Sequence, residues 1–78
     1  TANPEADLHR RELRQRVWRA LAKLPAEKRE IIVLRDFHDL SYSDIAKVLD
    51  IPIGTVMSRL HGSRRQLRAQ LEEGGRHA

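Results

Sequence analysis

The chain has 78 residues, enough for one small domain with a single modest core. Apolar residues make up 40% of it and charged residues 33%, a balance typical of a globular chain rather than a disordered one. Cysteine is absent, which excludes disulfides and thiolate metal sites, and the net charge of +4 favours a polyanionic partner.

Neither end of the sequence suggests a targeting or membrane segment. No run approaches the roughly 18 consecutive apolar residues that a transmembrane helix needs. The opening residues do not resemble a signal peptide, and the missing initiator methionine suggests a piece of a longer protein. We expect residues 5–73 to form the folded domain, with residues 1–4 and 74–78 as frayed ends.

The first predicted helix spans residues 5–23. Apolar residues recur along it at steps of three and four, which places them on one face. This face comprises Leu13, Val17, Ala20, Leu21 and Leu24. Five arginines cover much of the remaining surface, and we interpret them as a solvated face: Arg10, Arg11, Arg14, Arg16 and Arg19.

Pro25 ends the first helix and suits the first turn of the second, which is predicted over residues 26–37. Four consecutive apolar residues, 31–34, make this second helix apolar around most of its circumference. In so small a domain, such a helix is either central or meets a partner along one flank. Alternatively, the second helix packs into a small secondary core and has no docking role.

A short third helix is predicted over residues 42–49. Ser41 followed by Asp44 has the S-x-x-D form of a helix N-cap. Its expected buried residues are Ile45, Ala46 and Leu49. Asp50 stands at the following turn, where we expect a left-handed backbone, and Pro52 is acceptable just before the next helix.

The fourth predicted helix spans residues 53–71 and contains no acidic residue. At 100° per residue, one set of side chains falls within about 80° and should be buried. This stripe comprises Val56, Leu60, Ser63, Leu67 and Leu71. The opposite side is polar and basic, with Gly54, Ser58, His61, Gly62 and Arg65. A short helix, a turn and a longer acid-free helix are typical of a helix-turn-helix DNA-binding unit, here residues 42–71.

Four short motifs occur in order along the chain. They are Leu24-Pro25-x-x-x-Arg29, Leu34-Arg35-Asp36, Leu40-Ser41-Tyr42-x-x-Ile45-Ala46 and Gly54-Thr55-Val56-x-Ser58-Arg59-Leu60-His61. With these motifs, residues 13–71 resemble region 4 of a bacterial extracytoplasmic-function (group 4) sigma factor of the sigma-70 family. The resemblance implies an all-α domain of four helices with a C-terminal helix-turn-helix, of the sigma region 4 or winged-helix-like type.

The resemblance also implies the partners. Such a domain binds the −35 promoter element in the bacterial cytoplasm while docked on the flap tip of the RNA polymerase β subunit. The family docks through apolar surface of its first two helices, so Ile32 and Val33 are the expected docking residues. An anti-sigma factor that covers these surfaces is a further implied partner. No cofactor, metal, membrane or small-molecule substrate is expected.

The family's −35 contacts map onto Arg35, Tyr42, Gly54, Thr55, Ser58, Arg59, His61 and Gly62. The residue types agree with this role. Hydroxyls of Tyr42 and Ser43, near the start of a helix, can hold phosphate. Ser58 and His61 can reach base edges or phosphates, and Arg65 would follow the DNA backbone one turn further on.

Three positions leave alternatives open. Arg59 lies on the shoulder of its helix, where a solvated or intradomain charge is an equal alternative. Gly62 and Met57 stand where relatives often carry basic or, at Gly62, aromatic side chains. Either the −35 sequence recognised here differs, or the helix approaches the groove more closely at Gly62. A glycine at mid-helix also costs roughly 1 kcal/mol relative to alanine.

Two other functions compete with the sigma factor. A LuxR-type or other regulator helix-turn-helix shares the Ile-Ala and Thr-Val pairs, although the arginine-rich first helix and the Leu24-Pro25 junction favour the sigma family. A helical protein-interaction module with a basic face is the alternative of another class. An enzyme is not expected, because the four histidines share no metal-ligand spacing and no nucleophile–base pair can be nominated.

Overall fold

The structure, a computed structural model, describes residues 3–76, which form four α-helices and one short π-helix. The elements are α1 (Pro4–Ala22), α2 (Ala26–Ile32), the π-helix η1 (Val33–Phe37), α3 (Tyr42–Leu49) and α4 (Ile53–Arg76). This part of the chain contains no strand, so the predicted all-α class is confirmed and no wing accompanies the helix-turn-helix there. None of its helices is long and apolar enough to cross a membrane.

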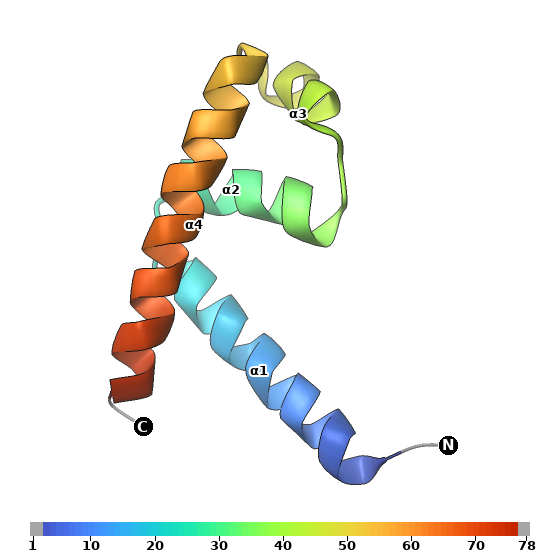
Figure 1. Ribbon diagram of the computed structural model, residues 1–78, viewed down its shortest axis with the longest axis vertical. Helices are drawn as coiled ribbons and strands as arrows, with labels where there is room; N and C mark the ends of the chain where they lie inside the picture. The colour runs from blue at the N-terminus through green and yellow to red at the C-terminus, as the bar shows by residue number, and fades with distance from the viewer. Residues whose placement is uncertain (1–2, 77–78) are drawn as a thin grey trace.

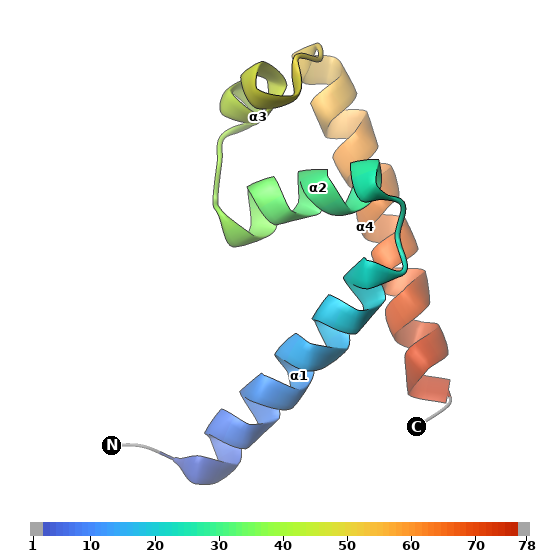
Figure 2. The ribbon, with the colours of Figure 1, turned by 180° about the vertical axis from the view of Figure 1, so that it is seen from behind.

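Helix α4 forms the long axis of the molecule (Figure 1). Helix α3 lies beside its N-terminal end, and α2 crosses it near the middle. Helix α1 leaves α4 at an angle, so that the two helices diverge towards the chain termini, as the view from behind also shows (Figure 2). The N-terminal half of α1 is therefore exposed on nearly all sides.

The core is a single cluster of aliphatic side chains in the angle between these helices. Its buried members are Leu21, Leu24, Ile31, Ile32, Ile45, Val56 and Leu60. Each of the four α-helices contributes to it, so the helix-turn-helix is packed directly onto the first two helices. The predicted stripe of α4 is confirmed at Val56, Leu60 and Ser63, which are fully buried, whereas Leu67 and Leu71 are half-buried.

The ends of the long helices differ from the prediction. Asn3 caps α1, because its Oδ1 accepts the backbone N–H groups of Glu5 (3.1 Å) and Ala6 (3.3 Å), so the helix begins at Pro4. Leu13, which was expected in the core, is 56% exposed because α1 has already diverged from α4 at that point.

The C-terminal end of α4 was also predicted too short. The helix continues to Arg76 instead of ending near Leu71, so residues 74–76 are helical and not a frayed end. Neither Gly74 nor Gly75 adopts a positive φ, and a glycine without that conformation need not stop a helix. The expected frayed residues 1–2 and 77–78 lie outside the described part of the chain.

The predicted second helix is helical over its whole length but changes type within it. The His38 N–H donates to the Val33 carbonyl oxygen, five residues earlier, at 3.1 Å, so the last turn is a π-helix. Val33 remains half-buried. The expectation that Ile32 is an exposed docking residue is wrong: its side chain is 1% exposed, because this side of α2 faces the core and α4.

The helix-turn-helix follows the predicted local signals closely. Ser41 Oγ accepts the Asp44 N–H at 3.0 Å, and α3 ends at Leu49 as expected. Asp50 adopts a left-handed backbone with φ of 55° and ψ of 52°. The turn thus redirects the chain into α4 within three residues, 50–52.

Leu60→Ala should lower the free energy of unfolding by about 2–5 kcal/mol, because it leaves a cavity between α4 and the other helices. Met57→Ala is the matched control on the same helix, since Met57 is largely exposed and its truncation should change stability by under about 0.5 kcal/mol. Urea unfolding followed by circular dichroism measures both. Coincident curves for Leu60→Ala and the parent would show that Leu60 is not part of the core.

Candidate nucleic-acid interface

One side of α4 is free of carboxylates and faces solvent. From Ile51 to Leu71 the chain contains no acidic residue. Gly54, Ser58, His61 and Arg65 are exposed on this side, as predicted, and lie opposite the buried stripe. These side chains therefore form a continuous polar and basic strip, and no acidic side chain of α4 offsets its charge over that length.

Gly54 and Gly62 leave the backbone of this strip uncovered. A methyl group added at either position would meet no other atom within 4 Å, and neither residue has a positive φ. Packing inside the domain therefore does not require glycine at either place. An outside molecule can approach the helix backbone more closely at these two points than at their neighbours.

The start of α3 brings a second group of predicted residues beside α4. Tyr42 is half-buried and Ser43 is exposed. The guanidinium carbon of Arg35 lies over the Tyr42 ring, 5.1 Å from its centroid, and Arg35 Nη1 donates to the Leu40 carbonyl oxygen at 2.8 Å. Arg35 also lies 3.8 Å from an Asp39 carboxylate oxygen. The structure thus fixes Arg35 against Tyr42.

A hollow of about 390 Å³ joins the two groups of residues. Its lining includes Tyr42 from α3 together with His61, Arg65 and Arg68 from α4. Arg68 was not among the predicted site residues. Its position one turn beyond Arg64 and Arg65, within the acid-free run from Ile51 to Leu71, was a signal that could have identified it.

The side chain of Arg59 is turned towards the domain and not towards this strip. Its Nη2 lies 2.7 Å from Glu27 Oε1, and the arginine side chain is only 25% exposed. This ion pair connects α4 to the first turn of α2. It favours the intradomain role for Arg59 that the sequence left open.

A further ion pair, which was not predicted from the sequence, connects η1 to α4. Arg64 Nε donates to Asp36 Oδ2 at 3.1 Å, and Arg64 Nη2 donates to the other carboxylate oxygen. These hydrogen bonds raise the pKa of Arg64 above its usual range. Arg64 lies about 80° around the helix from Val56, on the flank of the buried stripe, and that placement was the available signal.

A separate apolar surface lies between the end of α1 and the α2–η1 segment. The Trp18 and Phe37 rings pack at a centroid distance of 4.9 Å, although the two side chains are 47% and 44% exposed. Beside them is a groove of about 410 Å³. Its lining residues are Trp18, Ala26, Arg29, Glu30, Val33, Leu34 and His38. Exposed aromatic residues next to an apolar groove are typical of a surface that binds another protein.

Residues 3–76 contain no group of three or more histidine, aspartate or glutamate side chains that could hold a metal ion. The clustered polar groups of this part of the chain are instead basic and hydroxyl-bearing. Such groups bind phosphate and the edges of bases.

Comparison with known proteins gives consistent matches. Residues 14–67 match the family described as Sigma-70, region 4. The ECF RNA polymerase sigma-E factor of Escherichia coli (strain K12) is 44% identical over 63 residues, which cover 81% of this chain and 33% of that protein. The sigma-E factor of Salmonella typhimurium (strain LT2) gives the same values. The ECF RNA polymerase sigma factor SigW of Bacillus subtilis (strain 168) is 39% identical over 70 residues, or 90% of this chain and 37% of that protein. The chain thus spans about a third of the length of these relatives.

The Asp36–Arg64 pair should give a coupling energy of about 0.5–1 kcal/mol, because both side chains remain partly exposed to water. The measurement is a double-mutant cycle of Asp36→Asn and Arg64→Gln, with unfolding followed in urea. The same cycle with Asp7→Asn and Arg10→Gln, an exposed pair within one helix, is the control and should give less. Additive effects of Asp36→Asn and Arg64→Gln would show that the pair does not hold η1 to α4.

Proposed function

Since this chain belongs to the sigma-70 family and is region 4 of an extracytoplasmic-function sigma factor, we propose that it binds the −35 element of a bacterial promoter. In this role it serves transcription initiation in the cytoplasm as part of a longer sigma factor. The observation that carries the proposal is the acid-free, exposed strip of α4, which a capped helix and a tight turn present. A helix about 10–12 Å wide fits the major groove of B-DNA, which is about 12 Å wide.

Within this proposal, α4 is the recognition helix. Ser58 and His61 face base edges, because they lie centrally on the exposed strip. Arg65 lies one turn beyond His61 and contacts a phosphate. At Gly54 and Gly62 the helix backbone itself can come close to the duplex, since no side chain keeps it away.

The start of α3 contacts the DNA backbone in the proposed complex. Phosphate donors at this point are the hydroxyls of Tyr42 and Ser43 and the guanidinium of Arg35. The Thr55 hydroxyl is another, in the first turn of α4. Arg35 is already held by Tyr42 and Leu40, so less side-chain freedom is lost when it binds. Any phosphate contact by Arg59 would have to compete with its ion pair to Glu27.

Arg65→Ala should weaken binding to every duplex and lower the slope of log K against log salt by about one, because one phosphate contact is lost. Ser58→Ala and His61→Ala should instead change the relative affinity for different −35 sequences. Fluorescence anisotropy of labelled duplexes at several salt concentrations measures both effects. Arg14→Ala on α1 removes the same charge away from the strip and should leave the slope nearly unchanged. An unchanged slope for Arg65→Ala would contradict its proposed role.

We also propose that the apolar groove beside Trp18 docks on the flap tip of the RNA polymerase β subunit. Val33 and Leu34 line this groove and are only half-buried, so part of their apolar surface is available to a partner. The groove lies on the α1–α2 side of the domain, away from the strip of α4, so the domain can hold polymerase and DNA at once. An anti-sigma factor covering one of these surfaces would block the corresponding contact.

Val33→Asp should leave a cooperative thermal melt but weaken binding to an isolated β flap fragment by about 10-fold or more, because it places a charge in the apolar contact. Val48→Asp is the matched control, since Val48 is an exposed valine on α3, outside the groove. Ile32→Asp, by contrast, should unfold the domain because Ile32 is in the core. Equal affinities of the Val33→Asp and Val48→Asp variants for the flap would rule out this docking surface.

A further inference from the structure

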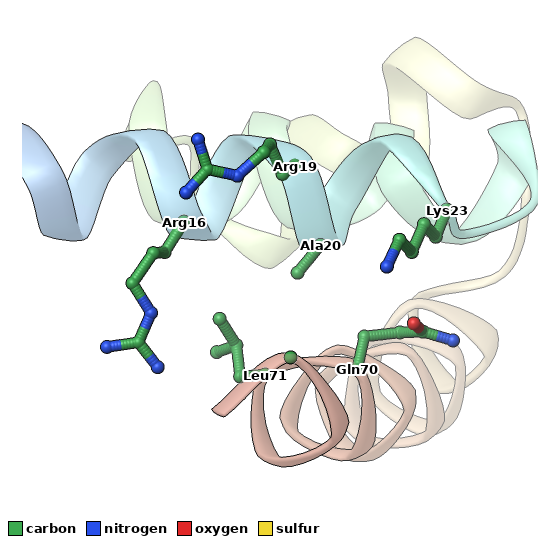
Figure 3. A pocket seen from close by; sticks show the side chains of 7 residues that line it. Arg16, Arg19, Ala20, Lys23, Gln70 and Leu71 are labelled. Atoms are coloured by element: carbon green, nitrogen blue, oxygen red, sulfur yellow. The ribbon is translucent and has the colours of Figure 1, made fainter. Parts of the chain in front are cut away.

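A third surface, which neither proposed contact uses, lies where α1 and α4 begin to diverge (Figure 3). It is a groove of about 150 Å³. Its lining residues are Arg16, Arg19, Ala20 and Lys23 from α1 and its C-cap, and Gln70, Leu71 and Gly74 from α4. We refer to it as the α1–α4 groove.

The charge of the α1–α4 groove is unbalanced. None of its three cations takes part in an ion pair within residues 3–76. The ion pairs of this part of the chain involve Arg10, Arg35, Arg59 and Arg64 instead. No acidic residue lines the groove. Uncompensated cations at the two ends of one hollow, Arg16 and Lys23, favour an anionic occupant.

The cations are arranged around an apolar middle. Figure 3 shows Ala20 and Leu71 facing each other across the groove, with Arg16 extending towards one end and Lys23 near the other. Arg16 and Lys23 are seven residues apart, which is about 10 Å along a helix. A methyl group at Gly75 would lie 3.8 Å from Arg16 Nη2, so this guanidinium lies close to the end of α4.

This pattern fits carboxylates on a protein better than phosphate. Arg16 and Lys23 lie towards opposite ends of the groove with Ala20 and Leu71 between them, and a phosphate gains nothing from contact with this apolar pair. A cavity of about 150 Å³ holds an apolar group roughly the size of benzene, which corresponds to one side chain. The complementary ligand therefore has an apolar side chain between two acidic ones.

The proposed promoter duplex cannot occupy the groove at the same time. At 100° per residue, Gln70, Leu71 and Gly74 lie about 120–180° around α4 from Arg65. DNA that contacts Arg65 is therefore on the opposite side of the helix. The occupant must be a different molecule.

We propose that the α1–α4 groove binds an acidic segment of a partner protein, which inserts one apolar side chain between Ala20 and Leu71 and pairs its carboxylates with Arg16 and Lys23. The contact is independent of the proposed promoter and flap contacts, because it shares no residue with them. Its ionic part is exposed to water, so the affinity falls as salt rises.

The probe is a fluorescein-labelled, alanine-based helical peptide with Glu, Leu and Glu at positions i, i+4 and i+7, matching the spacing of Arg16, Ala20 and Lys23. Anisotropy at low salt should show saturable binding to the 78-residue chain. The double variant Arg16→Glu/Lys23→Glu should bind it about 10-fold more weakly and should gain affinity for the corresponding Lys, Leu and Lys peptide. Replacing the peptide leucine with serine should also weaken binding.

The matched control is Arg11→Glu/Arg14→Glu, which makes the same change in net charge on another side of α1. It should alter peptide binding by less than about twofold. Circular dichroism melts verify folding, and the single variants Arg16→Gln and Lys23→Gln, which only remove charge, provide the same comparison if the double reversal unfolds the domain.

Several results would overturn the proposal. One is the absence of saturable binding to the parent chain, and another is an equal loss in the control, which would indicate unspecific attraction between charges. A third is a larger loss of promoter-duplex binding for Arg16→Glu/Lys23→Glu than for the control, which would make the groove a DNA contact. Displacement of the peptide by inorganic phosphate at millimolar concentration would assign the cations to a small anion instead.

Discussion

The buried stripe of α4 is the constraint on which the other features depend. Helices α1, α2 and α3 all pack against it, and Val56 and Leu60 are almost completely inaccessible to water. A helix in this position cannot rotate about its axis without exposing apolar surface, at about 25 cal/mol for each Å². The orientation of its polar strip is therefore set by the same contacts that stabilise the domain, and weakening the core would also loosen the proposed DNA-binding surface.

The basic residues divide into two groups that composition alone cannot separate. Three arginines have a partner inside the domain: Arg35 connects η1 to α3, Arg59 connects α4 to α2, and Arg64 connects α4 to η1. Arg65 and Arg68, by contrast, have no ion-pair partner in the described part of the chain and remain available to a ligand. The net charge of +4 counts both groups alike, although the paired arginines mainly hold helices together.

Features encoded by neighbouring residues were predictable, whereas those that depend on distant contacts were not. The Ser41 cap, the turn at Asp50 and the phase of α4 each follow from a few adjacent residues, and the structure confirms all three. The exposure of Leu13 and the burial of Ile32 depend instead on where α1 and α2 meet α4. The partners of the arginines also lie far away in sequence: Arg64 and Asp36 are 28 positions apart. Helical periodicity shows which side of a helix is apolar, but not how far a neighbouring helix continues to cover it.

The π-helix η1 has a consequence for how the length of this segment can vary. Its wider turn holds one residue more than an α-helical turn would, which makes it equivalent to a single-residue insertion in an α-helix. Loss of one residue between Val33 and Phe37 would restore regular α-helical hydrogen bonding, so local geometry would tolerate it. The segments on either side of the turn would keep their relative orientation, because the wider turn absorbs the extra residue. The side chains within the turn would change position, including Asp36, which binds Arg64, and Phe37, which packs on Trp18. The effect of a one-residue change in length here would therefore be confined to this turn and its two side-chain contacts.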